Sequence, residues 1–96
     1  MYIDDDYDVE SNQQRFLAEI NFHAAHILGN NITVEFVDAG QMDIPSAYIQ
    51  PNYKDLTLKI NRAVALPMAS YELSRMVMDS IYHLHFFKWF HFDLMN

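Results

Sequence analysis

The chain has 96 residues, with 13 acidic and 6 basic side chains, a net charge of −7 and a hydrophobic fraction of 51%. This length allows one domain, and this hydrophobic fraction is enough for a core, so global disorder is excluded. The absence of cysteine excludes disulfides, thiolate zinc sites and cysteine nucleophiles, and it favours the cytoplasm. No apolar run approaches the roughly 18 residues of a membrane span, so no membrane partner is expected.

The negative charge is concentrated at the N-terminus, where five carboxylates lie within seven positions. They are Asp4, Asp5, Asp6, Asp8 and Glu10. Because closely spaced carboxylates repel one another, residues 1–10 are predicted to form a flexible acidic tail and residues 11–96 a single domain. The tail is either a solubilising segment or a decoy that occupies the phosphate track of a nucleic-acid-binding protein. Direct binding of nucleic acid is not expected, because the chain has no basic patch.

The first half of the chain predicts one helix followed by three strands. Ser11 and Gln14 form a capping-box pattern before apolar residues at helical spacing, which predicts a helix at about 12–28 that Gly29 ends. Alternating apolar and polar residues then predict strands at 32–37, 46–50 and 56–61. The residues between the last two of these strands are predicted to form a turn.

The rest of the chain predicts a long helix. Neither glycine nor proline occurs from Tyr71 to Phe92, and Pro67 or Ser70 suits the first position of a helix. The fold class is therefore predicted to be α+β: an N-terminal helix, a three-stranded antiparallel or mixed sheet, and a long C-terminal helix.

One segment of the chain carries a resemblance to a known family. The strand that ends in Ile60-Asn61 is followed, after a short connection, by Tyr71-Glu72-Leu73-Ser74-Arg75 on a helix. This order resembles the core of the ImmA/IrrE-type zinc metallopeptidases, in which a similar strand precedes a helix bearing His-Glu-x-x-His.

The chain departs from that family at the metal site. Tyr71 and Arg75 stand where the two zinc-binding histidines are expected, and a guanidinium is permanently charged and cannot bind zinc. Glu72 stands at the position of the general base, which needs a metal-activated water to act on. The resemblance therefore implies a pseudo-enzyme that has kept the scaffold and lost the metal.

The histidines give a second hypothesis about metal binding. Glu19, His23 and His26 lie three or four residues apart on the first helix, so they share a face and form a candidate ligand set. The alternative, which we adopt, is that both histidines flank the apolar stripe, so no metal or cofactor is expected. A divergent metal hydrolase would use Glu72 with His23, His26 or His83.

The last helix carries an aromatic block. Its rings are Phe86, Phe87, Trp89, Phe90 and Phe92, and they point in most directions around a helix. A domain of this size has one small core, so some of these rings are expected to be exposed or covered by another chain. Phe86, Trp89 and Phe90 are the predicted contact residues, with Trp89 as the anchor. The alternative is that the first helix, the sheet and the N-terminal tail cover the block.

These patterns predict a non-catalytic, protein-binding inhibitor of phage or mobile-element type, similar by analogy to anti-CRISPR and other anti-defence proteins. Its partner is expected to be a protein, such as a nucleic-acid-binding protein of the host, in the host cytoplasm. The predicted contacts are the acidic carboxylates and the aromatic block. Two alternatives stay open: a metal-dependent peptidase or hydrolase that uses Glu72, and a structural protein that forms a homodimer through the last helix.

Overall fold

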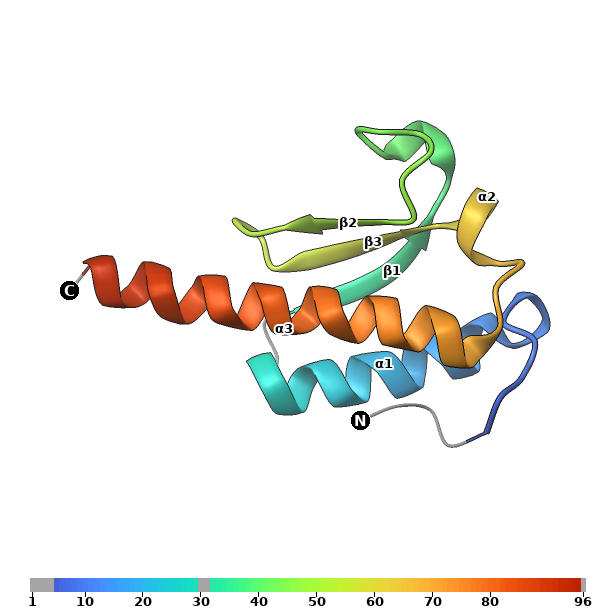
Figure 1. Cartoon of the computed structure of the whole chain (residues 1–96), viewed down its shortest axis with the longest axis horizontal. Helices are drawn as coiled ribbons and strands as arrows, with labels where there is room; N and C mark the ends of the chain where they lie inside the picture. Colours follow the sequence, from blue (N-terminus) through green and yellow to red (C-terminus); the bar gives the residue numbers. More distant parts are fainter. Residues whose placement is uncertain (1–4, 30–31, 96) are drawn as a thin grey trace.

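The computed structural model describes residues 5–29 and 32–95, with side chains as far as Phe87. The elements are a 3₁₀ turn η1 (Glu10–Asn12), helix α1 (Gln13–Leu28), strand β1 (Thr33–Val37), a 3₁₀ turn η2 (Ala39–Gln41), strands β2 (Ile49–Asn52) and β3 (Thr57–Asn61), a short helix α2 (Arg62–Ala65) and helix α3 (Ser70–Met95). The architecture is α+β, as predicted, with a helix, a three-stranded mixed sheet and a long C-terminal helix (Figure 1).

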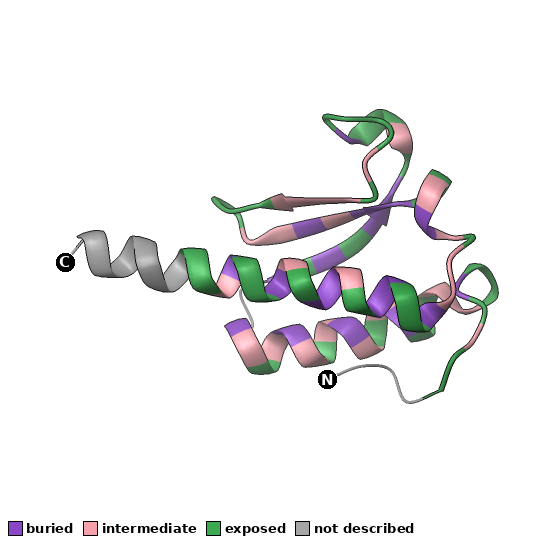
Figure 2. Cartoon of the chain, in the orientation of Figure 1, coloured by how far each residue is buried: buried purple, intermediate pink, exposed green. Residues whose placement is uncertain are grey.

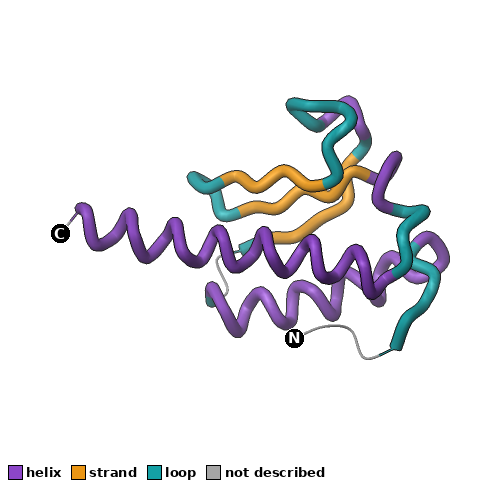
Figure 3. The backbone as a smooth tube through the Cα atoms, in the orientation of Figure 1, coloured by secondary structure: helices purple, strands orange, loops and turns teal. Residues whose placement is uncertain are grey.

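The sheet has the strand order β1-β3-β2, with β3 parallel to β1 and antiparallel to β2. Residues alternate between its two faces, so the pairs Val34–Leu58 and Phe36–Ile60 lie on one face and are buried. Both long helices cover that face and form a second layer (Figure 3). The core therefore lies between one sheet face and the two helices.

Helices α1 and α3 lie side by side and run in the same direction (Figure 1). Their buried stripes are Phe16, Ile20, Ala24 and Leu28 on α1, and Leu73, Val77, Ile81 and Leu84 on α3. Along the described part of α3, buried residues alternate with exposed ones, because only one side of the helix faces the core (Figure 2). The C-terminal part of α3 extends beyond the end of α1 (Figure 1).

Both edges of the sheet are blocked against further strand pairing. At the β1 edge, the side chain of Asn21 accepts a hydrogen bond from the Val34 amide at 3.0 Å and donates one to the Val34 carbonyl at 3.1 Å. At the β2 edge, the residues on either side of Pro51 bond inward to β3, so Pro51 faces outward. Proline has no N–H to offer to another strand. Such devices protect an edge strand from pairing with another chain.

Two local predictions were wrong, and one short element was missed. The capping box is absent, because Ser11 lies in η1 and its hydroxyl donates to Asp8 Oδ2 instead. The second strand runs later than predicted and includes Pro51, which an edge strand tolerates. The short helix α2 was not predicted; the Asn61 side chain caps it by accepting from the Ala63 amide at 3.0 Å.

Candidate functional site

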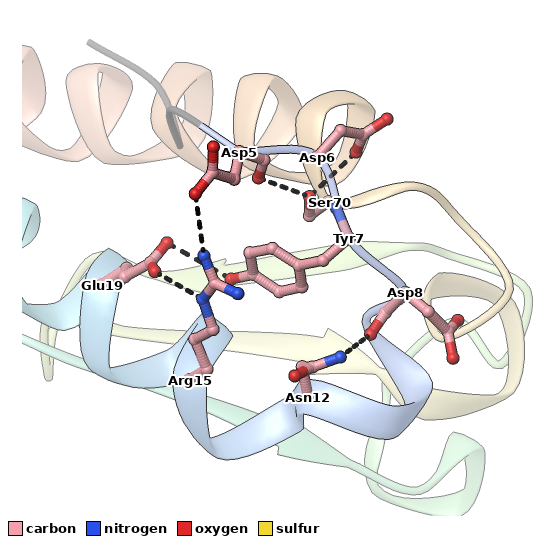
Figure 4. Close-up of polar contacts among 8 residues, drawn as sticks. All are labelled: Asp5, Asp6, Tyr7, Asp8, Asn12, Arg15, Glu19 and Ser70. Atoms are coloured by element: carbon pink, nitrogen blue, oxygen red, sulfur yellow. Dashed lines mark hydrogen bonds and ion pairs between the residues drawn. The ribbon is translucent and has the colours of Figure 1, made fainter.

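The N-terminal residues 5–10, which we call the acidic segment, pack against the first turn of α3 (Figure 4). Asp6 Oδ1 accepts hydrogen bonds from the Ser70 hydroxyl at 2.9 Å and from the Tyr71 amide at 3.1 Å. The Ser70 hydroxyl in turn accepts from the Tyr7 amide at 2.9 Å. Two backbone contacts, Ser70 N to Tyr7 O and the bridge between Asp8 and Ala69, align the segment beside residues 69–70.

Tyr7 ties the acidic segment to α1. Its hydroxyl donates to Glu19 Oε2 at 3.2 Å, and the Arg15 guanidinium lies 4.0 Å from the centre of its ring (Figure 4). Arg15 also pairs with Glu19 at 3.0 Å and with Asp5 at 3.6 Å. Burial and the neighbouring Glu19 carboxylate raise the pKa of Tyr7 to about 12. The phenol is therefore a hydrogen-bond donor throughout the physiological range.

The parallel arrangement of α1 and α3 explains why a carboxylate-rich segment packs here. Because both helices begin at the same end of the molecule, their unpaired amides and positive dipole ends lie together (Figure 1). Asp6 accepts from the Tyr71 amide at the start of α3, and Asp8 Oδ2 accepts from the Ser11 amide and hydroxyl in η1. Hydrogen bonds from Tyr71 and Ser70 lower the pKa of Asp6 below its ordinary value.

The structure differs from the predicted flexible tail. Val9 is fully buried and belongs to the core, and Asp6 and Asp8 use carboxylate oxygens for bonds within the chain. Asp5 and Glu10 are exposed, and Asp4 lies outside the described residues. Charge counting missed the packing because Asp6 and Asp8 are bound by backbone amides and serine hydroxyls, which carry no formal charge.

The residues of the metallopeptidase resemblance lie at the start of α3. Tyr71, Glu72 and Arg75 are all exposed, and the Arg75 guanidinium lies 6.0 Å from the centre of the Tyr71 ring. Asn61, the last residue of the strand in that resemblance, is fully buried and donates to the carbonyls of Pro45 and Ala47 at 2.8 and 2.9 Å. Asn61 therefore fastens the loop before β2 to the end of β3.

The histidine hypothesis places its three residues on one helix, but Glu19 is already engaged by Arg15 and Tyr7. His26 Nδ1 lies 2.9 Å from the Phe22 carbonyl, and the Phe22 ring lies 4.6 Å from the His26 ring. Within residues 5–29 and 32–87, no three His, Asp or Glu side chains are grouped to hold a metal ion. The described residues thus supply no ready-made metal centre.

The side of α3 that points away from the core carries both charged and aromatic residues. We call this surface the outer face of α3; its residues are Glu72, Arg75, Asp79, Tyr82 and Phe86, all exposed. They repeat every three or four residues, so they form one stripe along the helix. Phe86 is 74% exposed and Tyr82 is 45% exposed, which leaves two large rings in water one turn apart. The side chains of Trp89 and Phe90 lie outside the described ones.

An aromatic contact lies beside the outer face of α3, where the turn between β2 and β3 approaches the helix. The Tyr53 ring lies 4.7 Å from the Phe87 ring, and each side chain is still 41% exposed. Asn52 Oδ1 fixes the turn by accepting from the amides of Lys54 and Asp55. Leu56 closes the turn with a φ of 53°, a conformation that costs a leucine strain energy.

A shallow depression lies at the other end of α3, beside the acidic segment. Its lining residues are Asp6, Tyr7, Asp8, Pro67, Met68 and Ala69. Pro67 and Met68 give it an apolar wall, and the acidic segment gives it a polar one. The depression therefore lies at the start of α3, whereas the exposed rings of the outer face lie near the middle of the same helix.

The chain was compared with models of protein families, with curated proteins and with solved structures, and none of the three comparisons found a match. None of the helices, over the residues that the structure describes, has the length and apolar character needed to cross a membrane.

Proposed function

We propose that the protein binds a protein chain, without catalytic chemistry of its own, through the outer face of α3. The exposure of Phe86 carries this proposal, because a 74% exposed ring forgoes roughly 1.5–3 kcal/mol of available burial. Tyr82, one turn earlier, extends the same apolar strip. Exposed aromatic strips of this kind mark protein interfaces, and aromatic side chains supply much of their binding energy.

The hydrolase alternative has weaker support. Glu72 is exposed on the first turn of α3, whereas His23 and His26 lie on α1, and Glu19 is held by Arg15 and Tyr7. Elemental analysis of the purified protein separates the two functions. We expect no stoichiometric zinc; one zinc per chain that is lost in a His23→Ala variant would favour the hydrolase.

The finer hypothesis, an anti-defence inhibitor of phage type whose acidic segment acts as a decoy, stays a prediction. The Asp5 side chain pairs with Arg15 at 3.6 Å but is still 83% exposed, so a basic partner can reach it, whereas Asp6 and Asp8 accept hydrogen bonds within the chain. We therefore assign the main contact to α3 and expect the acidic segment to add long-range attraction that weakens as salt rises. The family resemblance and the cytoplasmic location likewise stay predictions.

A capture experiment with a matched pair of variants tests the proposal. The full chain is immobilised and exposed to an extract of its source cells, and Phe86→Ser is compared with Ile44→Ser. Both substitutions remove an exposed apolar side chain, 74% and 62% exposed respectively, but Ile44 lies in the loop between β1 and β2. We expect Phe86→Ser to weaken capture at least about tenfold and Ile44→Ser to leave it unchanged. Equal capture by both variants would contradict the proposal.

A further inference from the structure

The outer face of α3 is complementary to itself when two copies lie antiparallel. Along the helix its charges read Glu72, Arg75 and Asp79. The ion pairs found among the described residues do not involve Arg75 or Asp79, although the two lie one helical turn apart. Arg75 instead lies near the Tyr71 ring. The outer face thus offers one cation, Arg75, and two anions, Glu72 and Asp79, to a partner.

We propose that a second copy of this chain occupies the outer face of α3, in an antiparallel dimer with its two-fold axis at the level of Val77. This inference rests on the proposed function and names the partner. Residues equally far from Val77 in opposite directions then face each other, so Arg75 meets the partner's Asp79, and the symmetry repeats the pair. A parallel pairing would instead place each charge against its own copy, which electrostatic repulsion opposes.

The same register gives partners to the rest of the face. Tyr82 and Glu72 lie five residues from Val77 on opposite sides, so the Tyr82 hydroxyl meets the partner's Glu72 carboxylate. Phe86 lies nine residues beyond Val77, so it projects past the first turn of the partner's α3, towards the connection that carries Met68 in the wall of the depression beside the acidic segment. A thioether against an aromatic ring is a favourable contact. From Glu72 to Phe86 the outer face spans about 21 Å of helix.

Mixing two charge-reversal variants tests both the partner and the register. Asp79→Arg makes both positions basic and Arg75→Glu makes both acidic, so each variant alone should repel its own copy. Sedimentation velocity over a range of concentrations should show each variant dimerising at least about tenfold more weakly than the wild-type chain. An equimolar mixture should restore dimers, because each cation of one variant then faces an anion of the other. An ion pair within one chain cannot produce this restoration.

Two controls match the charge changes. Asp43→Arg and Lys54→Glu change the net charge equally at exposed positions away from the outer face, and they should leave dimerisation unchanged. Circular dichroism should show that all four variants are folded. Wild-type protein that stays monomeric, variants that dimerise normally, or a mixture that restores nothing would each overturn the antiparallel dimer.

The same experiments distinguish failure of the dimer from failure of the proposed binding function. A monomeric wild-type chain whose capture of a cellular protein requires Phe86 would reject the dimer and keep the binding function. If Phe86→Ser affects neither sedimentation nor capture, both ideas fail.

Discussion

Asp6 and Ser70 are 64 residues apart in the sequence, yet the Ser70 hydroxyl donates a hydrogen bond to Asp6 Oδ1 at 2.9 Å. Ser70 is fully buried at the first position of α3, and the same Asp6 oxygen accepts from the next amide, that of Tyr71. One carboxylate from the N-terminus therefore caps the last helix. This contact joins the N-terminal segment to the start of α3 and makes the acidic segment part of the fold.

Replacing this cap should destabilise the protein. Asp6→Asn keeps the size of the side chain but removes its negative charge near the start of α3, so we expect the thermal midpoint to fall by a few degrees. Thermal unfolding followed by circular dichroism at neutral pH measures the effect. Asp43→Asn, at an exposed loop position, is the control and should leave the midpoint unchanged.

The Asp6 cap also predicts that part of the stability of the protein is lost in acid. Hydrogen bonds from the Tyr71 amide and the Ser70 hydroxyl lower the folded-state pKa of Asp6 below its ordinary value of 3.8. The stabilisation is therefore present above the ordinary pKa and is lost as pH falls through the lowered pKa. The difference in thermal midpoint between the wild-type chain and Asp6→Asn should shrink as pH falls from 5 to about 2. A difference that stays constant over this range would argue against the cap.

Tyr7 predicts a loss of stability at alkaline pH. Burial and Glu19 raise its pKa from 10.0 to about 12, so the neutral phenol is favoured in the folded chain. Its stabilisation is present below the unfolded pKa and is lost as pH rises from 10 towards 12. Tyr7→Phe removes this group, and its stability should decline less over that range than that of the wild type. Urea unfolding at several alkaline pH values measures the difference, with Tyr53→Phe as the control.

The helices and strands that periodic patterns define were predictable from the sequence. The apolar stripe of α1 is buried at Phe16, Ile20, Ala24 and Leu28, and the alternation in β1 and β3 gives one buried sheet face. These elements follow local spacing, which a sequence displays directly. β2 was misplaced because proline usually ends a strand, and only the sheet order reveals that Pro51 lies at an edge.

The packing of the acidic segment was not predictable in the same way. The sequence shows repulsion among neighbouring carboxylates, but the attraction comes from helix ends that only the parallel arrangement of α1 and α3 brings together. One local signal was present: Val9 and Tyr7 are large side chains within the charged run, and both contact the core. Phe86 is exposed, and both the role of the aromatic block as a contact surface and the Trp89 anchor stay predictions.

The buried Asn61 gives a prediction about the loop that covers the end of the sheet. Its amide group donates to two carbonyls, and its Oδ1 accepts from the Ala63 amide. Asn61→Asp removes both donors and sets a carboxylate against the Pro45 and Ala47 carbonyls. We expect a loss of about 2–4 kcal/mol in the free energy of unfolding at pH 7, measured by urea denaturation. Asn52→Asp, at the exposed end of β2, should cost clearly less.

Asn21 gives a prediction about aggregation as well as stability. It lies on α1 and bonds both the amide and the carbonyl of Val34, the groups through which the β1 edge would pair with another strand. Asn21→Ala leaves both groups without a partner, which should cost about 1–3 kcal/mol of unfolding free energy. It also opens the edge, so light scattering under mildly destabilising conditions should rise faster than in the wild-type chain.

A matched control separates these two consequences of the Asn21 change. Asn61→Asp is expected to be at least as destabilising, but it leaves the Asn21–Val34 contacts in place. If lower stability alone caused aggregation, the two variants should aggregate at similar rates when compared at equal fractions of unfolded protein. We expect Asn21→Ala to aggregate faster at equal unfolded fraction, because its folded state exposes an edge that the Asn61→Asp variant keeps covered. Equal rates would mean that Asn21 stabilises the fold without protecting the sheet edge.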